Sequence, residues 1–99
     1  MQNQTMTRSE VRSIVIAELV AVEQAIGCPV PTITDSTRPI GDLEGFDSQV
    51  SEDTTATILG NLGAPPETKN PFTLRDGQHH VTLDRIVDYF CRAAGVKET

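Results

Sequence analysis

A serine in the middle of the chain, Ser48, stands where a phosphate group could be anchored. It follows the turn-forming stretch Asp42-Leu43-Glu44-Gly45-Phe46-Asp47 and opens a segment with helical periodicity. The first N–H groups of a helix have no partners within the helix, and together with the helix dipole they favour an anion. The hydroxyl is therefore a candidate attachment point for a phosphate. The simpler alternative is that Asp47 or Ser48 only caps the helix, because both residue types favour that position.

Other residues with reactive side chains give weaker signals. His79 and His80 have no Cys or carboxylate cluster at ligand spacing beside them, so we expect loop histidines and no metal site. Cys91 lies in an apolar helical pattern and is expected to be a packed thiol. The sequence shows no convergent acid and base set and no glycine loop of the nucleotide-binding type, so we do not expect an enzyme.

The first helix that must position the serine is predicted over residues 8–26. Thr7 and Glu10 have the spacing of a capping box, and Gly27 suits the C-terminal end. Apolar residues recur three or four positions apart and form one stripe, and we expect Glu23 to lie off it. The residues of this stripe are Val11, Ile14, Val15, Leu19, Val22 and Ile26.

A second helix is predicted over residues 48–62 and a third between Thr82 and Gly95. In the helix over residues 48–62, an apolar or Thr residue recurs every fourth position. Several Thr residues and Gly60 are poor helix formers, so this helix needs tertiary packing to be stable. The repeating residues are Val50, Thr54, Ile58 and Leu62 in the second helix, and Leu83, Ile86, Val87, Phe90 and Ala94 in the third.

Two long connectors join these helices. The first, residues 28–46, is rich in Pro and Gly, and its isolated apolar residues predict a loop that single side chains fix to the core. These residues are Ile33, Ile40, Leu43 and Phe46. In the second, residues 64–80, we prefer a turn opened by Asn70-Pro71 to a hairpin around Asp76-Gly77.

Size and charge restrict the function classes. The chain has 99 residues and a formal net charge of -6. We expect one domain, residues 8–95, behind a flexible tail, residues 1–7. The acidic balance disfavours nucleic acid and anionic membranes, and no apolar run is long enough to span a bilayer. Residues 1–10 lack a signal-peptide pattern, so we expect a cytoplasmic protein, and we expect it to be a monomer. In the cytoplasm Cys28 and Cys91 are expected to stay reduced, and a disulfide between them is the minority alternative.

The order of these features resembles the acyl carrier protein family. A long helix and a long loop precede Gly45-Phe46-Asp47-Ser48, and a second helix, a short element and a final helix follow. The stretches that carry the resemblance are residues 42–48 and 82–89, and it extends over roughly residues 8–95. It implies an all-α fold, a small three- to four-helix bundle of acyl-carrier type with a long loop between the first and second helices.

The resemblance also implies a carrier that works with separate enzymes. A phosphopantetheinyl transferase would attach 4′-phosphopantetheine from coenzyme A to Ser48, and Asp47 beside it would contribute to recognition. The arm would hold acyl or aminoacyl groups as thioesters and deliver them to enzymes of lipid metabolism, such as fatty acid biosynthesis, or of secondary metabolism. The residues implied in partner binding are Gln49, Val50, Glu52 and Asp53.

The chain departs from the family pattern in three places. Gln49 stands where the family normally has Leu, the second helix is sparsely acidic beyond Glu52 and Asp53, and the connector 63–81 is longer than usual. These departures fit a specialised free-standing carrier, and they also fit a relative that has lost its arm. The alternative function is therefore an unmodified helical protein-interaction module.

Overall fold

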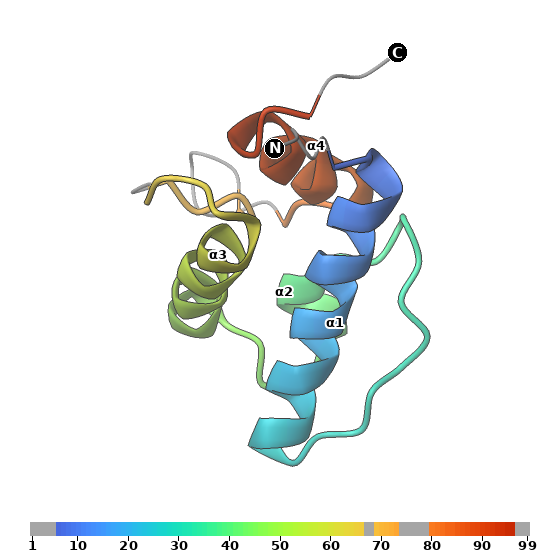
Figure 1. Cartoon of the computed structure of the whole chain (residues 1–99). Helices are drawn as coiled ribbons and strands as arrows, with labels where there is room; N and C mark the ends of the chain where they lie inside the picture. The colour runs from blue at the N-terminus through green and yellow to red at the C-terminus, as the bar shows by residue number, and fades with distance from the viewer. Residues whose placement is uncertain (1–5, 67–68, 74–79, 97–99) are drawn as a thin grey trace.

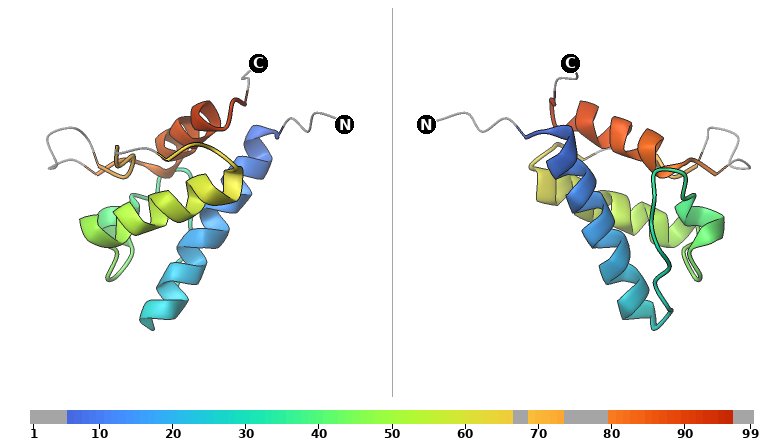
Figure 2. Two further views of the ribbon diagram at one scale, coloured as in Figure 1. Left: turned by 60° about the vertical axis from the view of Figure 1, so that its left-hand side comes forward. Right: turned by 90° about the vertical axis from the view of Figure 1, so that its right-hand side faces the viewer.

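The computed structural model describes residues 6–66, 69–73 and 80–96. Within these ranges it contains four helices, which are α1 (Arg8–Ile26), α2 (Pro39–Asp42), α3 (Ser48–Leu62) and α4 (Leu83–Ala93). The predicted all-α class and small bundle are confirmed. α1 packs against both α3 and α4, and α4 crosses the end of the bundle at which α1 begins (Figures 1 and 2).

α1 has the predicted bounds because both of its ends are fixed by local signals. The Thr7 hydroxyl accepts a hydrogen bond from the Glu10 N–H (3.2 Å), and the Glu10 carboxylate accepts one from the Thr7 N–H (2.8 Å). At the other end Gly27 has a φ of 89°, the left-handed conformation that stops a helix at low cost. Met6, two residues before α1, also packs against the core.

Two positions on α1 differ from the predicted stripe. Ile26 is 43% exposed, whereas Glu23 is fully buried, so the prediction that Glu23 lies off the stripe is wrong. Glu23 follows the buried Leu19 by one helical turn, and the chain near Gly45 folds back against this end of α1. A Cβ atom at Gly45 would lie 3.3 Å from the Ile26 side chain and 3.6 Å from the sulfur of Cys28.

α3 begins at Ser48 and ends at Leu62, as predicted. Thr54 and Ile58 are buried as expected, and the helix also buries three residues outside the predicted repeat, Ser51, Thr55 and Leu59. The hydroxyls of Ser51, Thr54 and Thr55 each donate to a backbone carbonyl one turn earlier, at 2.7–2.8 Å. These bonds satisfy the hydroxyls, so the polar side chains can face the core.

The long loop after α1 supplies the N-terminal cap of α4. Thr82 precedes this helix as predicted, but its hydroxyl donates to the Asp84 carboxylate (2.6 Å) and does not cap a backbone N–H. The N–H groups of Leu83 and Asp84 instead donate to the carbonyls of Thr37 (2.8 Å) and Asp35 (3.2 Å). The loop is thus tied to α4 as well as to α1.

Three phenylalanines from three parts of the chain meet in the core. The rings of Phe46 and Phe72 lie 5.2 Å apart in a T-shaped contact, and those of Phe72 and Phe90 lie 6.4 Å apart. Leu43 is buried beside them, which confirms that single side chains fix the loop to the core. The four-residue element α2 was not predicted. It begins at Pro39, and two of its residues, Ile40 (ψ 111°) and Gly41 (φ 117°), have non-helical dihedral angles, so it is an irregular turn within the loop.

The described ends of the second connector contain parts of both predicted alternatives. The Asn70 side chain accepts a hydrogen bond from the Phe72 N–H (3.0 Å), which forms the expected turn. Thr73 and His80 form an antiparallel bridge, as a hairpin would require. The predicted hairpin tip at Asp76-Gly77 and the predicted loop histidine His79 lie outside the described residues.

Two glycines should respond in opposite ways to alanine. Gly45 has a φ of 75°, and an added Cβ would press on Ile26, so Gly45→Ala is expected to destabilise the fold by about 1–2 kcal/mol. Gly60, within α3, has nothing within 4 Å of an added Cβ, so Gly60→Ala is expected to stabilise by about 0.5–1 kcal/mol. Urea denaturation of both variants measures the difference, and a stabilised Gly45→Ala protein would contradict the placement of the loop against α1.

Candidate functional site

The start of α3 presents Ser48 to solvent. Ser48 is the first residue of this helix and is exposed, and Asp47 is the N-cap. The Asp47 carboxylate accepts a hydrogen bond from the Val50 N–H at 2.9 Å. Within the described part of the chain the Ser48 hydroxyl makes no hydrogen bond. Asp47 therefore performs the capping, and the Ser48 oxygen stays available for other chemistry.

Asn70, in the segment 69–73, is hydrogen-bonded to the first turn of α3. The Asn70 side-chain amide donates to the Ser51 hydroxyl at 2.7 Å, and this hydroxyl donates to the Ser48 carbonyl at 2.7 Å. The same amide also lies 3.5 Å from the Ser48 carbonyl oxygen. These bonds use the backbone of Ser48 and leave its side chain exposed, so the first turn of α3 is fixed while the hydroxyl remains accessible.

The predicted partner-binding residues separate into two groups. Gln49, Glu52 and Asp53 are exposed and share with Ser48 the outer side of α3. Val50 packs against the core with part of its surface covered. Three of the four predicted residues, Gln49, Glu52 and Asp53, therefore lie near Ser48 on one accessible surface. This surface carries two carboxylates and no basic residue.

The other candidate residues do not assemble into a site. His80 is exposed, Cys91 is buried, and Cys28 and Cys91 are not joined by a disulfide. Among residues 6–66, 69–73 and 80–96 no group of three His, Cys, Asp or Glu side chains is placed to hold a metal ion. In the same ranges no helix combines the length and apolar character needed to cross a membrane.

A pocket that was not predicted from the sequence lies beside α4. Its volume is about 330 Å³. Two arginines and a tyrosine on one side of α4 contribute to it, and their spacing of four and three residues is the signal that could have indicated it. The lining residues are Pro71, Thr73, Val81, Arg85, Asp88, Tyr89 and Arg92.

No family model, curated protein or solved structure matches the chain. Its function is therefore inferred from the geometry at the start of α3 and from the order of the helices.

Proposed function

We propose that this chain is a carrier protein that holds acyl or aminoacyl groups as thioesters on a 4′-phosphopantetheine arm attached to Ser48. One observation carries the proposal. An exposed hydroxyl without a hydrogen-bond partner in the described residues stands on the first residue of a 15-residue helix, and the neighbouring Asp47 supplies the cap. The order of α1, the long loop that contains α2, then α3 and α4 supports the acyl-carrier resemblance.

The chemistry of attachment places few demands on the carrier itself. The Ser48 oxygen would form a bond to the pantetheine-bearing phosphorus of coenzyme A, the bond from that phosphorus to the adenosine-containing phosphate would break, and the hydroxyl proton would pass to a base of the transferase. The product is a phosphodiester with one negative charge. The positive end of the α3 dipole favours such a charge at this place.

The exposed outer side of α3 supports partner recognition at the same end of the molecule. Glu52 and Asp53 follow Ser48 by one turn, so a partner with a basic patch would meet two carboxylates close to the arm. Gln49 adds an amide where carriers of this type usually present Leu. We infer that partners of this chain recognise a more polar surface around the serine.

Intact-protein mass spectrometry after incubation with coenzyme A and a broad-specificity phosphopantetheinyl transferase tests the proposal. We expect a mass gain of one phosphopantetheine group, located at Ser48 by peptide mapping and absent from Ser48→Ala. The matched control is Ser9→Ala, because Ser9 is also an exposed serine in the first turn of a helix, α1. Ser9→Ala should be modified as fully as the parent protein.

Two results would contradict the carrier function. One is a mass gain that survives Ser48→Ala, and the other is no gain with several transferases of different specificity. In the second case the alternative, an unmodified helical protein-interaction module, would account for the exposed surface of Gln49, Glu52 and Asp53.

A further inference from the structure

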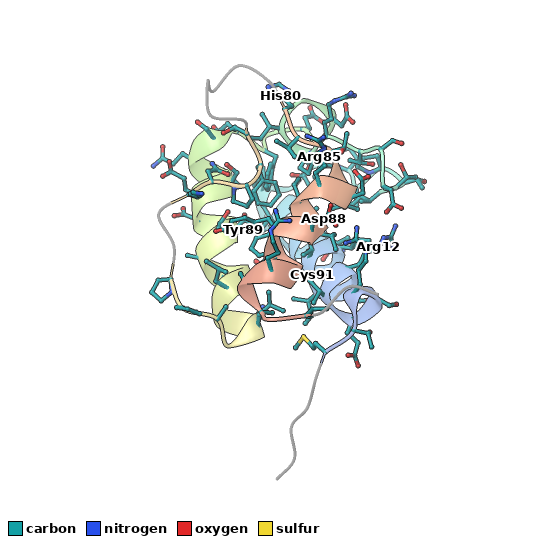
Figure 3. The ribbon with its side chains drawn as sticks, turned by 90° about the horizontal axis from the view of Figure 1, so that it is seen from above. Arg12, His80, Arg85, Asp88, Tyr89 and Cys91 are labelled. Atoms are coloured by element: carbon teal, nitrogen blue, oxygen red, sulfur yellow. The ribbon has the colours of Figure 1, made fainter. Side chains whose placement is uncertain are left out.

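We propose that the pocket between the segment 69–73 and α4 binds a small organic anion, namely a carboxylate or phosphate monoester joined to a short apolar group. The pocket lies on the side of the bundle formed by α4, and Figure 3 shows Arg85 and Tyr89 on that helix, with Tyr89 on the side nearer α3. This site does not depend on modification of Ser48.

The shape and lining of the pocket define the size and polarity of the ligand. Its volume of about 330 Å³ is near the lower end for small-molecule sites, so it suits a compact ligand. Pro71 and Val81 add apolar groups to the lining, and Thr73 adds a hydroxyl. The half-buried Tyr89 ring rests in a T-shaped contact on Phe90, with the ring centres 5.2 Å apart. These groups would contact the apolar part of the ligand.

The charges of the pocket favour an anion. Among the described residues that line it, Asp88 carries the one carboxylate, and this carboxylate forms an ion pair with Arg8 of α1. The side chains of Arg85 and Arg92 make no ion pair or hydrogen bond with the rest of the described chain. Two exposed arginines therefore line one pocket of a protein whose formal net charge is -6. A guanidinium fork matches the paired oxygens of carboxylates and phosphates.

Helix stability does not account for Arg85. This residue is the third of α4, and a positive charge in the first turn opposes the helix dipole. Arg92, by contrast, lies in the last turn, where the dipole favours a cation. A cation that opposes the dipole of its own helix and lines a pocket supports a ligand of opposite charge.

The test follows backbone amide shifts of the full, unmodified ¹⁵N-labelled chain during titration with phenyl phosphate at low salt. We expect saturable shifts confined to the pocket and weaker binding by about tenfold for Arg85→Gln and for Arg92→Gln, the loss of one charge-assisted hydrogen bond. The matched control is Arg38→Gln, an exposed arginine that does not line the pocket, and it should change the affinity by less than about twofold.

Three further probes test the ligand class. Benzoate should bind the pocket as phenyl phosphate does, and the preference between them distinguishes carboxylate from phosphate ligands. Inorganic phosphate and benzyl alcohol should each bind more weakly than phenyl phosphate. Inorganic phosphate lacks the apolar group, and benzyl alcohol lacks the negative charge. Ser48→Ala should bind phenyl phosphate with the affinity of the parent protein. A negative result for anion binding in the pocket is therefore independent of whether Ser48 carries the arm.

Four outcomes would overturn the proposal. These are shifts that do not saturate, shifts spread evenly over the surface, an equal loss of affinity in Arg38→Gln, and equal binding of either incomplete probe. Arg85 and Arg92 are exposed, so their variants should fold, which circular dichroism of each variant verifies.

Discussion

Phe72→Ala is expected to lower the free energy of unfolding by about 3–5 kcal/mol. Phe72 is fully buried, and its ring contacts Phe46 from the long loop and Phe90 from α4. Truncation would leave a cavity between segments that are far apart in the sequence. Domains of this size have a total stability of about 5–15 kcal/mol, so this single change would remove a large share of it.

Urea denaturation at neutral pH measures this effect as a shift of the midpoint at constant slope. Phe72→Leu is the matched control, because it keeps an apolar side chain in the same space and should cost no more than about 1.5 kcal/mol. A loss below about 1 kcal/mol in Phe72→Ala would show that the segment 69–73 does not pack in the core as described.

Glu23→Gln is expected to raise the free energy of unfolding at pH 7, because it removes a buried charge. Both carboxylate oxygens of Glu23 are buried and have no hydrogen-bond partner among the described residues. Burial, together with the nearby charge of Glu44, raises the pKa of the Glu23 carboxyl above its ordinary value of 4.5. An ionised Glu23 is therefore a cost to the folded state, and an uncharged amide of the same shape removes the charge.

The direction of the pH dependence follows from this raised pKa. The folded chain holds the Glu23 proton more tightly than the unfolded chain does. The contribution of the protonated group is therefore complete below pH 4.5 and is lost as the pH rises through the pKa of the folded state. We expect parent and Glu23→Gln proteins to have similar stability near pH 4 and to diverge above it.

Unfolding free energies at several pH values between 4 and 8 check this prediction. The control is Glu18→Gln, a substitution on the same helix at a position that is only partly covered, and it should track the parent curve. A Glu23→Gln protein that is less stable than the parent at pH 7 would mean that the carboxylate has a favourable partner.

The sequence was sufficient for elements whose signals are local. The capping box of Thr7 and Glu10 and the left-handed Gly27 lie within a few residues of the ends of α1, so its bounds could be predicted. The start of α3 at Ser48 was predictable for the same reason, since Gly45 and Asp47 provide the turn and the cap.

Positions covered by distant parts of the chain could not be predicted. Glu23 is buried because the loop near Gly45 returns to α1, and its residue type argues against burial. Ser51 and Thr55 can be buried because their hydroxyls are satisfied by the helix backbone, an option that a hydropathy pattern does not reveal. The pocket beside α4 needs Pro71 and Thr73 from another segment, so the arginines of α4 alone did not indicate it.

The loop that caps α4 also determines when this helix can form during folding. Its first N–H groups bond to Asp35 and Thr37, which lie far upstream in the sequence, and the helix has only 11 residues. A helix this short is marginal in isolation, and its cap exists only after the loop has crossed the molecule. α1 carries its own start and stop signals, so we expect it to form before α4, whose formation requires that the loop carrying Asp35 and Thr37 has first docked.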